Sequence, residues 1–343
     1  MSMKVLMVTN MYPSADRPGY GAFVKSQIDS LARAGVEVDL YYIPGYRRKL
    51  SYLSAPFGVL WATLRRRYDL VHAHYGLSAL AARLQFRAPV VVSFCGDDLY
   101  GHADESGKAT RRSLILAWLH RQSARLMQGV IVKSAAMAEL LPSTRAEVTV
   151  IPNGVDFERF RPLDRAACRR ELGLEQDRVY ILFPYDPKRP RKNYAGVKAA
   201  VEALNRRSGL DARVLFADGV PNERMPLYMN AADVLVLASF WEGSPNTVKE
   251  ALACNTRVVA VRVGDTEQLL DGIGASALCD YEPEDIATKL EQVLCSPQPP
   301  DGRARSQHLR MERIAGRVLE VYQRVLGRKD TRRSLEEGSP GAS

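Results

Sequence analysis

Two glutamates, Glu242 and Glu250, enclose the segment of this sequence with the clearest chemical potential. A short apolar run at residues 234–238 reads as a buried strand, and a helical pattern follows at residues 245–253. Ligands of open α/β sheets bind beyond the carboxyl ends of the strands. The sequence therefore predicts a ligand site at this turn.

The start of that helix predicts an anion site. We expect Ser244 to cap the helix and Pro245 to occupy its first turn, since proline has no N–H to leave unpaired. The amides of Asn246 and Thr247 would then point outward at the positive end of the helix dipole, which suits a diphosphate. Gly243 allows close backbone approach.

The flanking carboxylates would repel phosphate, so we expect Glu242 and Glu250 to bind hydroxyls, one on a sugar and one on a ribose. A solvated helix glutamate and an ordinary Ser-Pro cap are the alternative explanations. The combination of residues favours the ligand site.

A second turn is strongly basic. It follows a predicted strand at residues 179–183, and Asn193 can cap the next helix. Cations at a strand-to-helix turn favour phosphate binding, although a merely basic loop explains this turn equally well by itself. Its four cations are Lys188, Arg189, Arg191 and Lys192.

The first turn of the chain contains Gly19 and Gly21 after a predicted strand at residues 4–9. It lacks the third glycine of a dinucleotide fingerprint, and the chain has no Gly-Lys-Ser/Thr. We therefore expect neither a nicotinamide enzyme nor a P-loop protein. His72 and His74 end another predicted strand, and for this pair a structural role and a role in the cleft remain equally open.

Strands and helices alternate along the chain, which predicts parallel sheets covered by helices on both faces. The length of 343 residues suits two domains. The alternation breaks after residue 152, so we expect doubly wound domains at residues 1–152 and 153–326. We expect the last helix at residues 306–326, and the polar tail at 327–343 reads as disordered.

The net charge of +9 lies mostly in the first domain, where residues 1–152 contain 19 Lys and Arg against 11 Asp and Glu. Solvated surface and contact with an anionic membrane explain it equally well. Nucleic-acid binding is disfavoured, because no aromatic residues alternate with the basic clusters. Without a signal peptide, a long apolar run or paired cysteines, we expect a cytoplasmic protein. The basic first domain leaves open a peripheral position at the inner face of the membrane.

The segment from Glu242 to Glu250, with the residues 231–234 before it and 251–261 after it, resembles the retaining glycosyltransferases of family 4. Asn-Gly-Val-Asp at residues 153–156 is similar to the hinge of that family. The resemblance covers most of residues 3–325 and is specific in the second domain. It implies the GT-B fold, in which two Rossmann-like domains face a central cleft, and a last helix that returns to the N-terminal domain.

The resemblance also implies donor-binding roles. Glu242 would contact the sugar hydroxyls, Glu250 the ribose, and the amides of residues 243–247 the sugar and diphosphate. The arginine and lysine that bind phosphate in the family correspond to Arg189 and Lys192.

Two further donor contacts and one departure follow from the same resemblance. Gly21 would lie near the diphosphate, and the backbone of Val220 near the base. Where the family often has His-Gly beside the reacting sugar, this chain has Cys95-Gly96-Asp97-Asp98. A thiol is a weak hydrogen-bonding group, so Asp97 or Asp98 would take over part of the role, with Cys95 and Asp97 as the catalytic candidates.

The implied activity is metal-independent, retaining transfer of a hexose from a UDP or GDP sugar to an acceptor hydroxyl, without a cofactor. The acceptor would be a lipid-linked or cell-surface glycan precursor. Two alternatives remain open: a sugar-nucleotide epimerase, and a non-catalytic module that binds nucleotide sugar.

Overall fold

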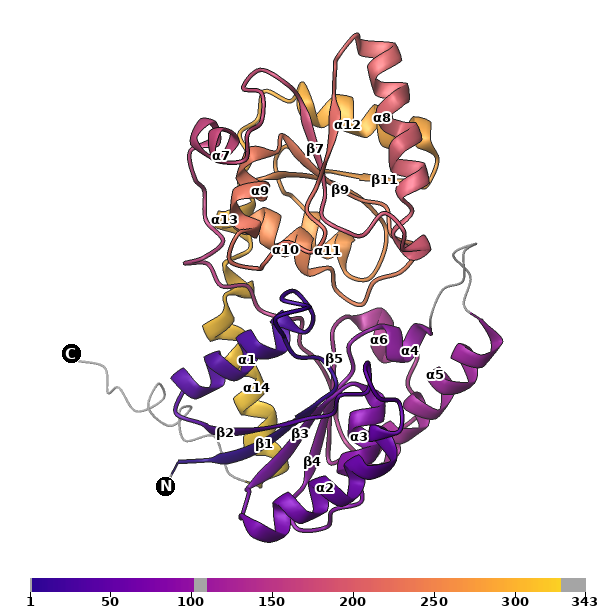
Figure 1. Cartoon of the computed structure of the whole chain (residues 1–343), viewed down its shortest axis with the longest axis vertical. Helices are drawn as coiled ribbons and strands as arrows, with labels where there is room; N and C mark the ends of the chain where they lie inside the picture. The colour runs from indigo at the N-terminus through magenta and orange to yellow at the C-terminus, as the bar shows by residue number, and fades with distance from the viewer. Residues whose placement is uncertain (1, 102–109, 328–343) are drawn as a thin grey trace, which may run out of the picture.

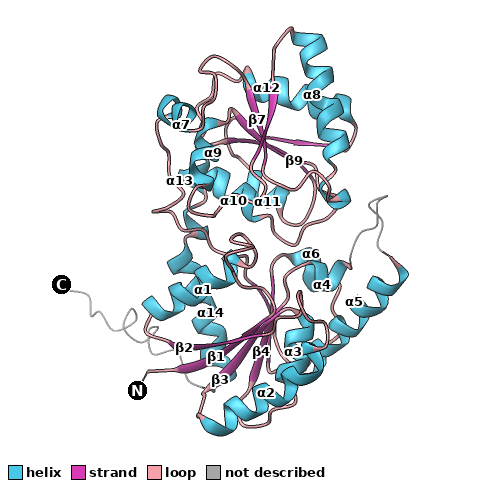
Figure 2. Cartoon of the chain, in the orientation of Figure 1, coloured by secondary structure: helices cyan, strands magenta, loops and turns pink. Residues whose placement is uncertain are grey.

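A computed structural model describes residues 2–101 and 110–327. The described strands form two parallel sheets, one in each domain, with helices on both faces (Figure 1, Figure 2). The first sheet has the order β2-β1-β3-β4-β5-β6. Its strands are β1 (Lys4–Thr9), β2 (Glu37–Tyr42), β3 (Leu70–His74), β4 (Val90–Ser93), β5 (Gly129–Val132) and β6 (Val148–Val150).

The second sheet has the order β11-β10-β9-β7-β8. Its strands are β7 (Tyr180–Phe183), β8 (Arg213–Phe216), β9 (Val234–Leu237), β10 (Arg257–Val261) and β11 (Ala277–Cys279). The described strand pairs of both sheets are parallel, and the predicted α/β class with two doubly wound domains is confirmed.

The helices of the first half are α1 (Ala22–Arg33), α2 (Ser51–Arg65), α3 (Gly76–Ala82), α4 (Asp97–Tyr100), α5 (Arg111–Ser123), η1 (Ala124–Leu126) and α6 (Ala135–Glu139). Those of the second half are α7 (Arg165–Glu171), η2 (Pro190–Lys192), α8 (Tyr194–Ser208), α9 (Met225–Ala231), α10 (Asn246–Ala253), α11 (Thr266–Leu270), α12 (Pro283–Leu294), α13 (Gly302–Arg305), η3 (Gln307–Leu309) and α14 (Met311–Val325).

Each sheet lies between two apolar layers, because alternate side chains of its strands point to opposite faces. In the first domain, α1 and α14 cover one face, while α2, α3 and α5 cover the other (Figure 1). In the second domain, α9, α10 and α11 lie on one face, and α8 and α12 on the other. Strands buried on both faces are nearly continuous apolar runs, which is why the sequence predicts them so well.

Several short elements were not predicted, namely β11, α4, α7, α11 and α13. Each has at most seven residues, which leaves little periodic pattern to detect. The expected helix at 306–326 is wrong at its start, because α13 and η3 precede α14, which begins at Met311. The predicted disordered tail lies outside the described residues apart from Gly327.

The chain crosses between the domains twice, at the hinge and at the start of α14. The two crossings lie side by side, since the Val155 amide donates to the Leu309 carbonyl (2.9 Å) and the Met311 amide to the Val155 carbonyl (3.0 Å). Position 154 requires glycine, because a Cβ atom there would lie 2.9 Å from Cα of Met311. α14 then packs against α1 and β5 of the N-terminal domain. The boundary at residue 152 stays a prediction.

Candidate active site

A buried ionic cluster lies at the carboxyl edge of the second sheet. β7 and β9 are neighbours, so the turn after β7 and the loop after β9 meet there. Lys192 Nζ lies 2.5 Å from Glu242 Oε1, and Arg191 Nη1 lies 3.5 Å from Glu242 Oε2. The lysine also lies over the ring of Tyr185, 3.7 Å from its centroid. Two cations therefore converge on one carboxylate.

Burial and charge act in opposite directions on Glu242. Burial by itself would raise the pKa of this carboxyl, but the charges of Lys192 and Arg191 outweigh it and hold the pKa below the ordinary value. Burial lowers the pKa of Lys192 to about 8, against the opposing effect of Glu242. The cluster is therefore ionised at neutral pH and buried in the cleft wall, where charges act strongly on a bound ligand.

Asn193 shapes the basic turn as predicted. It adopts the left-handed conformation with φ 54° and its side-chain oxygen accepts from the Gly196 amide at 3.2 Å, which caps α8. The turn of η2 just before it directs both Arg191 and Lys192 toward Glu242.

The cap of α10 differs from the prediction. Pro245 stands at the cap position and the helix begins at Asn246, so the expected cap by Ser244 is wrong. The Ser244 hydroxyl donates instead to Asp265 Oδ2 (2.6 Å) and accepts from Lys249 Nζ (3.1 Å). Two charged groups with little access to water compete more strongly for this hydroxyl than a backbone amide does.

The first residues of α10 connect it to the hinge and to the turn after β7. Asn246 Oδ1 accepts from Asn153 Nδ2 of the hinge at 3.3 Å, and the hydroxyl of Thr247 pairs with that of Tyr185. Their amides belong to the first turn, whose N–H groups have no partner within a helix. This helix start lies beside Gly243 and the ionic cluster.

Glu250 differs from Glu242 in its environment. It lies half-buried within α10, and among the described residues no hydrogen bond to its carboxylate is recorded. Burial raises its pKa to about 7, with Lys249 and Arg159 opposing only in part. A hydroxyl donor from a ligand would stabilise its ionised form.

The first domain faces the cluster with the turn after β4. Asp97 Oδ1 lies 2.8 Å from Arg191 Nη1, an ion pair between the domains. At Gly96 the backbones approach closely, since an added Cβ would lie 3.4 Å from the Gly243 amide nitrogen. Asp98 turns inward and accepts from the amides of Gly96 (2.8 Å) and Cys95 (3.0 Å), which fixes the turn.

Residues 3–154 match the family described as Glycosyl transferase 4-like domain, and residues 190–296 match Glycosyl transferases group 1. The second is the segment that contains the ionic cluster. The chain belongs to the GT-B glycosyltransferases. This glycosyltransferase is 27% identical to D-inositol 3-phosphate glycosyltransferase 2 of Catenulispora acidiphila over 279 residues, which span 67% of this chain and 63% of that protein.

Solved structures share its fold. Sucrose-phosphate synthase of Thermosynechococcus elongatus has a TM-score of 0.76 at 22% identity, covering 95% of this chain and 100% of that one. Anabaena HepE in complex with UDP-glucose has a TM-score of 0.65 at 19% identity, covering 94% and 100%. In the described part of the glycosyltransferase, no helix is long and apolar enough to cross a membrane.

Several sequence candidates lie apart from the cluster. Arg189 is 63% exposed, and its nearest carboxylate is that of Asp186 at 4.0 Å, so the structure brings Arg191 rather than Arg189 to Glu242. Gly21 stands at the N-cap position before α1 with φ 75°, and Val220 packs on the apolar core after β8. Among the described residues no recorded contact joins these two to Glu242. The run Arg-Pro-Arg-Lys signalled a basic turn but not which arginine points inward.

Cys95 lies near the cleft but in a poor position for proton transfer. Its Sγ is 3.5 Å from the Ser93 carbonyl oxygen, and burial raises the pKa of the thiol. A neutral thiol is a weak hydrogen-bonding group. Of the two candidates in this turn, Asp97 is the one whose side chain makes a contact across the cleft, with Arg191.

The two histidines are core residues. His72 is buried and bridges Tyr322 of α14 (2.6 Å) and Ser93 of β4 (2.8 Å), and burial lowers its pKa to about 3. His74, also buried, stacks on it at 4.6 Å between ring centroids. The pair connects β3 to the returning helix, so the structural role is the one that the packing supports.

Lys249 was missed, because a lysine within a helix is normally solvated. Here it is fully buried, donates to the Asn153 carbonyl at 3.0 Å, and has a pKa lowered by burial to about 8. It connects α10 to the hinge.

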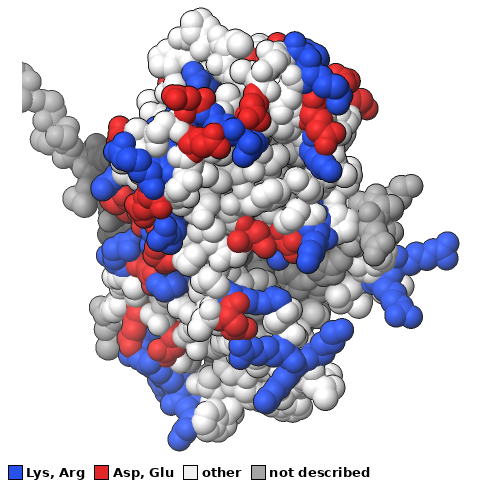
Figure 3. Space-filling model, turned by 45° about the horizontal axis from the view of Figure 1, so that its top comes forward, with Lys and Arg blue, Asp and Glu red and all other residues white. Residues whose placement is uncertain are grey.

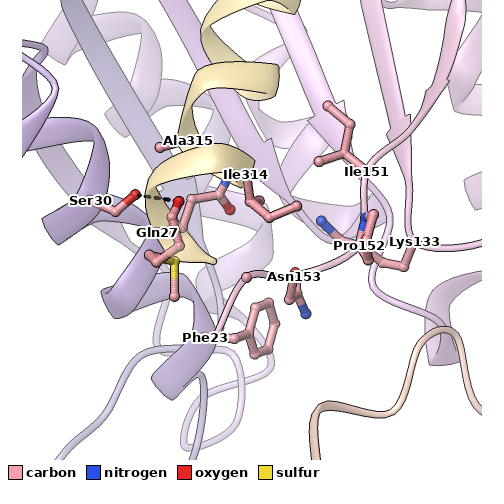
Figure 4. A pocket seen from close by; sticks show the side chains of 11 residues that line it. Phe23, Gln27, Ser30, Lys133, Ile151, Pro152, Asn153, Ile314 and Ala315 are labelled. Carbon is pink, nitrogen blue, oxygen red and sulfur yellow. Dashed lines mark hydrogen bonds between the residues drawn. The ribbon is translucent and has the colours of Figure 1, made fainter. Parts of the chain in front are cut away.

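A small pocket adjoins the hinge residues Asn153 and Gly154. Figure 4 shows it between α1, α14 and the segment after β6, and its lining does not include Glu242, Arg191 or Lys192. The pocket is lined by Phe23, Gln27, Ser30, Lys133, Ile151, Pro152, Asn153, Gly154, Met311, Ile314 and Ala315.

The residues that the structure describes contain no group of three or more His, Cys, Asp or Glu that could hold a metal ion.

Proposed function

We propose that this enzyme transfers a hexose from a nucleoside-diphosphate sugar to an acceptor hydroxyl with retention of configuration. One observation carries the proposal: Arg191, Lys192 and Glu242 form a buried cluster beside the start of α10, opposite Asp97 of the other domain. The HepE structure with UDP-glucose supports a nucleotide-sugar donor.

The donor would bind across the cluster. Arg191 and Lys192 hold the diphosphate together with the first amides of α10, which combine positive charge with a helix N-terminus. Glu242 accepts hydrogen bonds from sugar hydroxyls, and Glu250 from the ribose. Gly243 allows the sugar to approach the backbone, while Gly21 and Val220 would reach the diphosphate and the base when the cleft closes.

In the transfer step, the bond between the anomeric carbon and the diphosphate oxygen breaks. The acceptor oxygen bonds to that carbon on the same face, and its proton passes to the departing diphosphate. Arg191 and Lys192 stabilise the charge that develops there, so the reaction as proposed uses neither metal nor cofactor. The products are the glycoside and the free nucleoside diphosphate.

We infer that the acceptor is a lipid-linked or cell-surface glycan precursor that approaches from the N-terminal domain. The excess of positive charge in residues 1–152 supports an anionic acceptor or surface. The Asp97 turn is one part of that domain that meets the donor site, and Met137 of α6 lies against Gly243 beside it.

The test is binding followed by turnover. A nucleotide at 100 times its dissociation constant stabilises the fold by about 2.7 kcal/mol, so UDP, GDP, ADP and their sugars are compared by melting temperature. Product formation with a lipid-linked acceptor then separates the possibilities. Glu242→Ala should abolish turnover; because it removes the buried carboxylate of Lys192 and Arg191, its melting temperature is measured first to show that the variant is folded at the assay temperature.

Each other outcome has a distinct meaning. Turnover of the sugar nucleotide without an acceptor indicates an epimerase. Binding without any product indicates a module that only holds nucleotide sugar. Full activity of Glu242→Ala overturns the site assignment.

A further inference from the structure

Helix α2 has its amphipathic pattern inverted. Its inward face consists of small side chains: Ala55, Val59 and Thr63 are buried. Its outward face is a stripe of large apolar side chains at helical spacing, with Phe57 67% and Trp61 59% exposed. A surface helix normally turns such residues toward the core. The exposed stripe comprises Leu53, Phe57, Trp61 and Leu64.

Helix α5 repeats the inversion. It buries small and polar residues such as Ser113, Ala117 and Ser123, and it exposes Ile115 (63%) and Trp118 (56%). α3 lies between α2 and α5, and Phe86 just after it is also exposed. We call this surface of α2, α3 and α5 the apolar face. Exposed apolar patches of this kind mark interaction sites. Its other exposed members are Leu50, Leu80, Leu84, Leu114, Leu119 and Leu126.

The charge of the apolar face has a single sign. Residues 44–68, 76–88 and 110–127 contain 12 Lys and Arg and no Asp or Glu. Over the upper domain, both signs are interspersed, whereas basic side chains predominate at the lower right of Figure 3. Apolar side chains surrounded by cations match the chemistry of an anionic lipid surface.

We propose that the apolar face docks this enzyme on an anionic membrane. Phe57, Trp61 and Trp118 enter the boundary between headgroups and acyl chains, where amphipathic aromatic rings are favoured. The surrounding arginines bind lipid phosphates. Two of the three tryptophans of the chain lie on this face, and the third, Trp241, lies in the loop between β9 and α10.

A second copy of the chain fits this face less well than lipid does. Two copies meeting through it would bring like charges together, because among the described residues only Arg47 and Arg66 of these cations have a carboxylate partner. An anionic bilayer supplies the missing negative charge over the whole surface.

The apolar face is joined to the cleft. Arg121 Nε of α5 donates to the Leu99 carbonyl of α4 at 3.0 Å, and His120 Nδ1 lies 3.0 Å from the Asp98 carbonyl. The same short helix begins at Asp97, which pairs with Arg191. This inference rests on the proposed function in one respect only, the delivery of a lipid-linked acceptor to that turn.

The experiment is co-sedimentation of the full chain with vesicles of phosphatidylcholine alone or mixed with phosphatidylglycerol. We expect binding to the anionic vesicles that weakens as salt rises. In Arg65→Gln/Arg87→Gln/Arg112→Gln, binding should weaken about a hundredfold, since each basic residue near the surface contributes about fivefold. The matched control, Arg170→Gln/Arg206→Gln/Arg313→Gln, removes three exposed charges elsewhere and should bind like wild type.

A second variant separates the contribution of the inserted aromatic side chains to vesicle binding from the contribution of the charges. Phe57→Ser/Trp61→Ser/Trp118→Ser should lose vesicle binding while its melting temperature and the melting shift with UDP remain, because these side chains are exposed. Brominated lipid should quench wild-type tryptophan fluorescence and spare the Trp241 emission that remains in this variant.

Three results would overturn the proposal. The first is equal binding to neutral and anionic vesicles, and the second is vesicle binding that survives both the Arg65/Arg87/Arg112 variant and the Phe57/Trp61/Trp118 variant. The third is self-association of the wild-type chain that the Phe57/Trp61/Trp118 variant abolishes. Vesicle binding is measured without turnover. Failure of transferase activity with intact docking would therefore contradict the proposed function alone, and the reverse would contradict the docking alone.

Discussion

The two domains of this glycosyltransferase use charge in opposite ways. The C-terminal domain brings Glu242, Lys192 and Arg191 together in its cleft wall, where they are mostly withdrawn from water. The N-terminal domain places its excess cations on the outer surface among exposed apolar side chains, and it presents Asp97 to the cleft. The first arrangement suits a small ligand with concentrated charge, and the second suits an extended anionic surface.

The largest effect should come from removing the charge balance of the cleft. Lys192→Met leaves the buried Glu242 with Arg191 at 3.5 Å as its remaining cation. Breaking a buried pair in this way costs about 3–5 kcal/mol, so the free energy of unfolding should fall by that order. Denaturant unfolding measures it, and the melting shift with nucleotide should vanish as well. Lys188→Met, an exposed lysine in the same turn, is the control, and equal stability of the two variants would contradict the cluster.

The next effect distinguishes the two glutamates of the cleft by pH. Burial raises the pKa of Glu250 to about 7 from an ordinary 4.5, so the fold favours the protonated carboxyl. The stability from this group is fully present below pH 4.5 and is lost as pH rises through about 7. Relative to Glu250→Gln, wild type should lose about 1–3 kcal/mol of unfolding free energy between pH 4.5 and 8.

Thermal unfolding at several pH values measures this difference. Saturating nucleotide should reduce it, because a ribose hydroxyl that donates to the carboxylate favours its ionised form. If the unfolding free energies of wild type and Glu250→Gln changed in parallel with pH, the Glu250 carboxyl would titrate in the folded protein as it does in the unfolded chain.

The features that could be predicted from the sequence depend on residues close together along the chain. The strands were found because buried parallel strands are continuous apolar runs, and Asn193 was found because its cap is a local interaction. Glu242, Glu250 and the basic turn were found for the same local reason. The GT-B arrangement was implied by a resemblance that depends on these segments.

What could not be predicted depends on residues distant in sequence. The Ser244 hydroxyl donates to Asp265, which lies 21 residues further on, instead of capping α10. The buried Lys249 donates to the hinge carbonyl of Asn153. The choice between Arg189 and Arg191 depends on the turn of η2. The apolar stripe of α2 has the spacing of a core-facing helix, so its outward orientation was not visible in the pattern.

A smaller effect should arise where the domains meet. The Asp97–Arg191 pair is partly exposed, so Asp97→Asn should cost at most about 1 kcal/mol of unfolding free energy. Losing this contact between the domains should open the cleft, which small-angle scattering detects as a larger radius of gyration at low salt. Asp16→Asn removes a similar exposed pair within one domain, with Arg47, and should leave the radius unchanged. A radius that does not respond to Asp97→Asn would mean that other contacts hold the cleft.

The smallest effect should be at Cys95, the residue that stands where the family often has histidine. Burial raises the pKa of its thiol, so the group is neutral at pH 7 and cannot accept a proton from the acceptor. Its contact with the Ser93 carbonyl at 3.5 Å is a weak S–H hydrogen bond. Turnover of Cys95→Ala should therefore stay within about threefold of wild type, a barrier change of well under 1 kcal/mol. Cys295→Ala, at an exposed cysteine of the other domain, controls for general effects of removing a thiol. If only Cys95→Ala lost a hundredfold, the first domain would supply a reacting group at this turn. The division between a donor-binding domain and a docking domain would then be too simple.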